Sequence, residues 1–175
     1  MKIKEYLTVA IFGLLALSCN IIDNLLTFSI NNETSVTIPA GIPVNIPFEL
    51  SRDTPSNSST VLENNNTKAE LVKDVRLKEM KLTITDPTDK SFSFLKSIHM
   101  YISSSDGSDE IELAFFDDIN STSNIINLTC TPEKLDKYIK ASSFKLRVKV
   151  VTKETNTQNV TIKTNMKFQV TADPF

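Results

Sequence analysis

The chain has 175 residues, a net charge of −2 from 19 basic and 21 acidic side chains, three glycines and no tryptophan. That length is typical of one domain with a buried core, and the slightly acidic balance gives no reason to expect nucleic-acid binding. A phosphate-binding loop needs clustered glycines, and the glycines at 13, 41 and 107 are far apart, which excludes nucleotide-binding enzymes built on such loops.

The N-terminus has the three parts of a secretory signal. Lys2 and Lys4 precede an apolar run over residues 6–17, and the small residue Ser18 follows. The run is shorter than the roughly 20 residues that a membrane-spanning helix needs, which favours a cleaved signal over a transmembrane anchor.

A cysteine directly follows this signal. Residues 16–19 read Ala-Leu-Ser-Cys and fit a lipobox, except that Ala16 stands where leucine is usual. Ordinary signal peptidase would also accept this site and would cut the same bond. We expect residues 1–18 to be a lipoprotein signal peptide. Cys19 would then carry diacylglycerol and an acyl chain such as palmitate, with residues 19–25 as lipid anchor and tether.

The segment after the tether alternates between strand-like and polar stretches. Residues 26–30 and 34–38 are predicted strands of a hairpin whose tight turn is 31–33. Prolines surround residues 42–50, which therefore form an edge strand or an extended loop, and 52–60 is a predicted polar loop.

The middle of the chain predicts one short helix and one long strand. Thr67 and Glu70 fit a capping box, which predicts a helical turn or two over 68–73. Residues 75–85 form a predicted strand in which the apolar alternation slips by one residue. That slip indicates a β-bulge near Lys78 and Glu79.

Further period-2 patterns fill the C-terminal half. They cover residues 98–102, 111–115, 124–128, 144–150 and 160–170. Thr131 followed by Pro132 is typical of a helix start. Many strands, few helical turns and no βαβ alternation predict an all-β fold, an antiparallel two-sheet β-sandwich of immunoglobulin-like type with one or two short helical turns. We expect residues 26–175 to form this single domain.

An acidic stretch lies in the predicted hairpin loop and after the strand that follows it. Its carboxylates are Asp106, Asp109, Glu110, Asp117 and Asp118. Calcium prefers several converging oxygen ligands, so these residues are a candidate calcium site. The alternative is turn chemistry, because Asp-Gly is the commonest hairpin dipeptide. A sugar site at the same hairpin would need aromatic platforms, and only Tyr101, Tyr138 and Phe116, which falls opposite the apolar phase of its strand, are available.

Catalytic constellations are weak. His99 is the only histidine, and its place in an alternating strand favours a sheet-surface residue over a catalytic base. Cys130 is the only cysteine besides Cys19, and it is predicted to be buried and inert, with a Cys19–Cys130 disulfide as the alternative if Cys19 is not lipidated. We therefore expect no enzymatic activity and no resident cofactor.

Basic residues follow the polar faces of the last two strands. They are Lys145, Arg147 and Lys149 on one strand, and Lys163 and Lys167 on the next. If the two strands pair, these residues form a basic ladder that could bind a charged partner. The alternative is that the lysines only keep an outer sheet face soluble.

One central block has a resemblance to known proteins. It contains Val75-Arg76-Leu77, Leu82 to Pro87, Phe92 to Ile98 and Leu135 to Ile139. Together with the signal and the glycine-poor composition, the block resembles a family of small envelope lipoproteins of the Bacteroidota. The resemblance implies a sandwich fold and an outer-membrane address, and it brings no catalytic residues. Surface-exported members often carry an acidic cluster after the cysteine; here only Asp23 is present, which favours the periplasmic face.

These observations predict a non-enzymatic, lipid-anchored β-sandwich that binds or scaffolds another envelope component, such as a protein partner. The alternative is a small-ligand module for carbohydrate or calcium that uses the acidic hairpin at 106–118.

Overall fold

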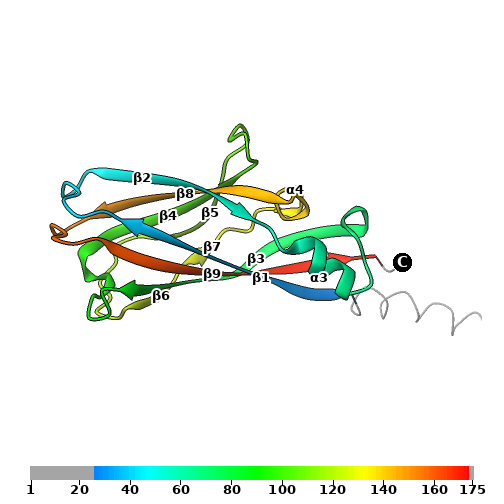
Figure 1. The fold of residues 1–175 in the computed structure, drawn as a ribbon, viewed down its shortest axis with the longest axis horizontal. Helices are drawn as coiled ribbons and strands as arrows, with labels where there is room; N and C mark the ends of the chain where they lie inside the picture. The colour runs from blue at the N-terminus through cyan, green and yellow to red at the C-terminus, as the bar shows by residue number, and fades with distance from the viewer. Residues whose placement is uncertain (1–25, 174–175) are drawn as a thin grey trace, which may run out of the picture.

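The computed structural model describes residues 26–173, in which two antiparallel sheets pack face to face (Figure 1). The four-stranded sheet contains, in order, β1 (Thr27–Ile38), β9 (Val160–Ala172), β3 (Val72–Asp86) and β6 (Ile125–Asn127). The five-stranded sheet contains β2 (Pro47–Pro55), β8 (Ser143–Thr152), β4 (Leu95–Ser103), β5 (Ile111–Phe116) and β7 (Thr129–Cys130). This confirms the predicted two-sheet sandwich. The predicted signal peptide, Cys19 and the tether lie outside the described residues.

The strand order shows how the chain is wound. Four pairs of hydrogen-bonded strands are nested in the sequence: β4 with β5, β3 with β6, β2 with β8, and β1 with β9. Successive pairs alternate between the two sheets, as they do when a long antiparallel ribbon is wrapped into a barrel-like sandwich. This is the connectivity of a jelly roll, and it differs from the strand order of an immunoglobulin domain.

The core forms where the inner faces of the two sheets meet. Along β8 every second residue from Phe144 to Thr152 is buried, and β9 alternates in the same way. Two further phenylalanines, Phe92 and Phe94, are fully buried on the short 3-10 helix η2 (Phe92–Phe94) at one end of the sandwich. For β8 and β9, the period-2 patterns in the sequence predicted both the strands and their inner faces correctly.

The predicted bulge in β3 is also present. The pairing of β3 with β9 shifts register between Leu77 and Glu79, and both Lys78 and Glu79 are exposed. The extra residue keeps Leu77 and Met80 on the same buried face, which is the physical reason for the slip in the sequence pattern.

The predicted hairpin at 31–33 is wrong, because β1 runs unbroken through these residues. Asn31, Asn32 and Glu33 pair with residues 165–167 of β9. The 13-residue strand β9 offers a continuous row of backbone partners, and this long pairing outweighs the local turn preference of the two asparagines.

The predicted polar loop at 52–60 is wrong as well. The edge strand β2 continues to Pro55 in antiparallel register with β8, and the helix α3 (Ser58–Asn64) follows. Prolines at both ends of β2 suit a strand at the edge of a sheet, as the sequence predicted for part of this segment.

The helical turns begin elsewhere than predicted. The 3-10 helix η1 (Ala69–Leu71) has no side-chain cap, and Thr67 instead donates a hydrogen bond of 3.1 Å to the Asp173 carbonyl. Thr131 likewise starts no helix; α4 (Asp136–Lys140) begins further on, and the Thr131 hydroxyl donates to the Glu112 carbonyl at 2.7 Å. Both threonine hydroxyls therefore donate to backbone carbonyls that are distant in the sequence, and neither caps a helix. None of the helices in residues 26–173 has the length and apolar character needed to cross a bilayer.

Candidate binding surface on the five-stranded sheet

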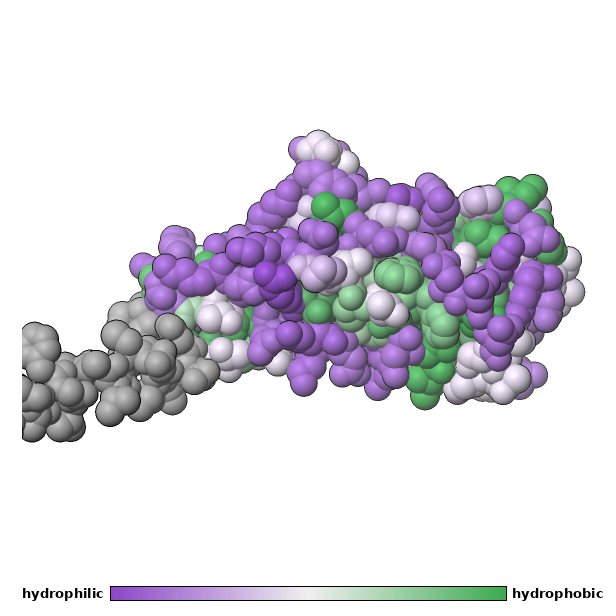
Figure 2. Space-filling model, turned by 180° about the vertical axis from the view of Figure 1, so that it is seen from behind, coloured by the Kyte–Doolittle hydropathy of each residue, from purple (hydrophilic) through white to green (hydrophobic). Residues whose placement is uncertain are grey.

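The loop between β4 and β5 holds the first acidic residues and projects from the body of the molecule as a hydrophilic knob (Figures 1 and 2). Asp106 accepts hydrogen bonds from the backbone and hydroxyl of Ser108, at 3.1 and 3.0 Å. Asp109 accepts two bonds of 2.7 Å from Ser104 and lies 2.8 Å from the Lys137 amine. These contacts hold the turn itself, and the neighbouring Lys137 amine lowers the pKa of Asp109.

The other acidic residues of this stretch have separate partners. Glu110 pairs with Arg147, Glu112 and Asp117 contact His99, and Asp118 stands in a left-handed backbone conformation with φ of 50°. The carboxylates of this stretch thus have different partners and do not converge on one point. Within the described part of the chain, no three histidine, cysteine, aspartate or glutamate side chains come together to hold a metal ion.

A register shift decides which side chains reach the outer face of β5. β4 and β5 slip by one residue between Met100 and Tyr101, so Phe115 pairs with His99 on the outer face. Phe116 pairs with Ile98, whose side chain is buried, and packs against the core. The sequence placed Phe116 opposite the apolar phase of its strand, either exposed or covering a sheet edge. The structure shows it partly buried against the core, and the bulge places Phe115 on the outer face instead.

Four side chains form a continuous line across the outer face of β8, β4 and β5. The His99 ring lies 6.4 Å from Tyr101 and 5.9 Å from Phe115 between ring centroids, with the planes within 18° of parallel. The Arg147 guanidinium lies over the Tyr101 ring, 4.1 Å from its centroid. We call Arg147, Tyr101, His99 and Phe115 the outer-face row.

Carboxylates hold the outer-face row in place from both sides. Arg147 donates two bonds to Glu110, at 2.8 and 2.5 Å, and a third nitrogen lies 3.0 Å from Glu49 of β2. These hydrogen bonds lower the pKa of Glu110. At the other end, His99 Nδ1 lies 2.7 Å from Glu112 and Nε2 lies 3.1 Å from Asp117.

The row is partly exposed and partly fixed. The Arg147 and His99 side chains are 21% and 24% exposed, so they are accessible yet held by neighbours. Partial burial, with the Glu112 carboxylate nearby, raises the pKa of Tyr101 above its ordinary value.

The predicted basic ladder does not form, because β8 and β9 belong to different sheets. The chain crosses from one sheet to the other after β8 instead of turning back beside it. Lys145 and Lys149 therefore face Asp53 and Glu49 of β2 across the five-stranded sheet. Lys163 and Lys167 lie on β9 in the other sheet, where Lys163 pairs with Glu33 at 2.8 Å.

The two residues considered for catalysis are arranged differently from a catalytic set. Both ring nitrogens of His99 contact carboxylates, whereas a triad histidine keeps one nitrogen toward a nucleophile. Cys130 is half-buried, and this burial raises the pKa of its thiol, which disfavours the nucleophilic thiolate.

Sequence reasoning missed Phe115 and Glu49 as parts of this surface. Residues 113–116 read Leu-Ala-Phe-Phe, an apolar run that fits either face of a strand. Its break in alternation was the only local signal for Phe115. Glu49 carries no signal, because its contact with Arg147 exists only once β2 pairs with β8.

The fold places the chain among β-sandwich proteins. No protein-family model and no curated protein matches it. Among solved structures, the BFDV capsid protein is 11% identical, over 85% of this chain and 93% of that one, with a TM-score of 0.43. PNGase F of Flavobacterium meningosepticum is 12% identical, over 84% of this chain and 43% of that one, with a TM-score of 0.42.

A carbohydrate-binding module of the β-sandwich superfamily is similar too. It is 13% identical over 85% of this chain and 56% of that one, with a TM-score of 0.31. These likenesses concern the fold alone, and the function has to be argued from the side chains.

Proposed function

We propose that this protein is a lipid-anchored, non-enzymatic binding module of the cell envelope, and that the outer-face row binds a protein partner. The observation that carries the proposal is the line of Arg147, Tyr101, His99 and Phe115 on one exposed sheet face. Neighbouring rings on a sheet face stabilise the sheet by themselves, and they also offer a partner a contact surface of aromatic side chains beside an arginine.

The composition and rigidity of the row suit protein recognition. Tyrosine and arginine dominate the residues that contribute most to binding at protein interfaces. The ion pairs of Arg147 with Glu49 and Glu110 fix its guanidinium before a partner arrives, so less conformational entropy is lost on binding. Acidic and basic groups around the rings would select a partner of matching charge pattern.

A carbohydrate ligand is the second candidate, and one contact speaks against it. Stacking a sugar ring requires an open aromatic face, and the Arg147 guanidinium covers one face of Tyr101 while the His99 ring lies stacked beside it. The acidic hairpin gives little support as a separate ligand site, because Asp109 and Glu110 already accept hydrogen bonds from Ser104 and Arg147.

The proposed anchor is lipid on Cys19, with the domain at the outer membrane and facing the periplasm. Its support is the signal-like N-terminus, the cysteine at the cleavage position and Asp23 as the one acidic residue that closely follows it. Such an anchor would hold the outer-face row within reach of other envelope proteins.

Photo-crosslinking in the native envelope tests the proposal. The full chain is produced with benzoylphenylalanine in place of Tyr101, and in a matched control in place of Gln169 on the outer face of the other sheet. We expect one protein to be crosslinked from position 101 only, and to be lost when Arg147→Met is added. A Cys19→Ser form should leave the membrane fraction and lose the crosslink.

Two results would contradict the proposal. The first is the same set of adducts from both positions, or none from position 101. The second is binding of the purified protein to a glycan panel that disappears with Tyr101→Ala, which would establish the carbohydrate candidate instead.

A further inference from the structure

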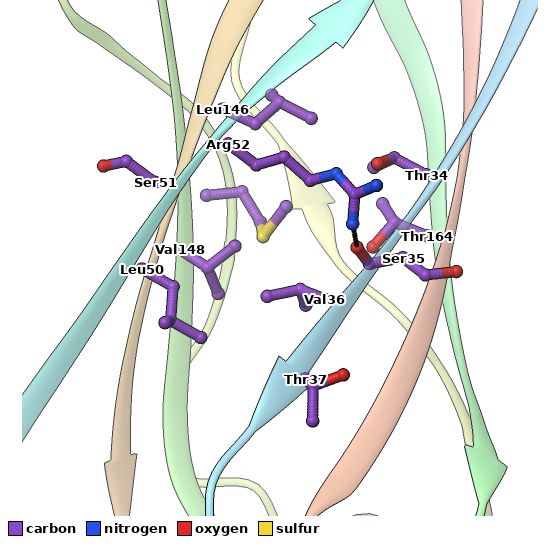
Figure 3. A pocket seen from close by; sticks show the side chains of 11 residues that line it. Thr34, Ser35, Val36, Thr37, Leu50, Ser51, Arg52, Leu146, Val148 and Thr164 are labelled. Atoms are coloured by element: carbon purple, nitrogen blue, oxygen red, sulfur yellow. Dashed lines mark hydrogen bonds between the residues drawn. The ribbon is translucent and has the colours of Figure 1, made fainter.

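A cleft opens between the two long edge strands, β1 of one sheet and β2 of the other, which lie near each other on one side of the sandwich (Figure 1). Its volume is about 380 Å³, within the range of small-molecule sites. Residues 34–37 of β1 and 50–52 of β2 form its sides (Figure 3).

The interior of the cleft is apolar. Met100, Leu146 and Val148 of the five-stranded sheet line the cleft and are buried. Val36 and Leu50 line it from β1 and β2 (Figure 3). This apolar surface favours a hydrocarbon ligand, since burial of such a chain removes apolar area from water.

One buried polar group lines the cleft without a partner. Thr164 of β9 is 1% exposed, and its hydroxyl makes no hydrogen bond within residues 26–173. A buried hydroxyl normally has a hydrogen-bond partner, because burial removes its hydrogen bonds to water and the lost free energy has to be offset. The unpaired Thr164 hydroxyl therefore indicates a ligand with an oxygen that can form a hydrogen bond to it.

One arginine crosses the mouth. Arg52 extends from β2 and donates a 2.6 Å hydrogen bond to the Ser35 carbonyl of β1. The other two arginines of the chain, Arg76 and Arg147, pair with carboxylates, whereas Arg52 has no such pair in the part of the chain that the structure describes. Its remaining donors are available to an anionic group.

We propose that this cleft binds one molecule of a fatty acid that carries a hydroxyl group near its carboxylate. The carboxylate meets Arg52, the chain lies against Leu50, Val148 and Met100, and a hydroxyl near the carboxylate pairs with Thr164. Figure 3 shows the Arg52 guanidinium and Thr164 on the same side of the cleft, which places the two polar groups of the ligand close together. This site is separate from the outer-face row and does not depend on the function proposed for it.

Calorimetry with two matched ligands tests the assignment. The protein is the full chain with Cys19→Ser, so that no covalent lipid competes, and the ligands are dodecanoic acid and 3-hydroxydodecanoic acid. The variants are Arg52→Met and Thr164→Val, with Lys78→Met at an exposed position of β3 as the control. Thr164→Val keeps the shape of the side chain and replaces the hydroxyl with a methyl group, which cannot form hydrogen bonds. Circular dichroism confirms that each variant is folded.

We expect one binding site with a preference for the hydroxylated acid. Arg52→Met should weaken both acids by about tenfold, the size of a lost charge-assisted contact. Thr164→Val should remove the preference and leave dodecanoic acid unchanged, and Lys78→Met should have no effect. The inference is overturned if the Cys19→Ser protein binds neither acid, if Lys78→Met weakens binding as much as Arg52→Met, or if Thr164→Val affects both acids equally.

Discussion

Arg147 organises the outer face of the five-stranded sheet. Its guanidinium joins three neighbouring strands or their ends, because it contacts Glu49 of β2, Glu110 before β5 and the Tyr101 ring of β4. Exposed ion pairs stabilise little on their own, but a two-pronged contact at a partly buried arginine has a defined geometry. The main effect of Arg147 is therefore on position, because its contacts fix where the side chains of its neighbours lie.

The stability of the protein should depend on pH through this contact. The pKa of Glu110 lies below its ordinary value of 4.5, so its contribution is complete above about pH 4.5 and is lost as the pH falls further. We expect Glu110→Gln to lower the melting temperature near neutral pH, and the gap to the unmodified protein to narrow progressively as the pH is lowered below 4.5. Thermal unfolding monitored by circular dichroism measures both.

Glu63→Gln, at an exposed position of α3, is the matched control and should show no such closing gap. A Glu110→Gln deficit that stays the same as the pH is lowered below 4.5 would contradict the role given to the Arg147 contact.

At the scale of elements, two of the register shifts in the sheets decide which side chains face outward: the shift between Leu77 and Glu79 in β3, and the shift between β4 and β5. The first was predictable, because polar Lys78 and Glu79 interrupt a clear alternation. The second was not, because the apolar run from Leu113 to Phe116 fits either face. A register shift can be predicted from sequence only where it interrupts the alternation of polar and apolar residues along the strand.

The two phenylalanines of β5 should therefore respond differently to truncation. Phe116→Ala removes a side chain packed against the core and should lower the free energy of unfolding by about 2 kcal/mol or more. Phe115→Ala removes an outer-face ring and should cost under about 1 kcal/mol. Urea unfolding measures both values, and a larger loss for Phe115→Ala would mean that the register shift is absent.

The molecule as a whole is held by pairs of strands that are distant in sequence. The outermost pair, β1 with β9, joins Thr27 to Thr171, and the cleft exists because the partners of β1 and β2 lie in opposite sheets. Such pairings require long loops to close before any contact offsets the lost chain entropy.

We therefore expect slow folding. Refolding from urea, followed by stopped-flow fluorescence of the tyrosines, should have its main phase on the order of milliseconds to seconds, as in other sandwiches rich in long-range contacts. Refolding within microseconds would show that local elements dominate the barrier and would contradict the nested pairing as the rate-limiting event.

Local patterns in the sequence were enough to predict the all-β class, the strands β8 and β9 and the bulge in β3, and they narrowed residues 42–50 to an edge strand or an extended loop. Alternation, prolines and a broken phase are local signals, because side chains of a strand point to opposite faces in turn. The sequence also named Arg147 and Glu110, though as parts of two different sites.

The tertiary structure alone sets which strands are neighbours. It separated β8 from β9, turned Phe115 outward, joined Glu110 to Arg147 and left the cleft with Arg52 and Thr164 between the sheets. The physical reason is that alternation marks the buried face of a strand but does not say which strand lies beside it. Backbone hydrogen bonds, which nearly every residue can make, then join segments far apart in the chain.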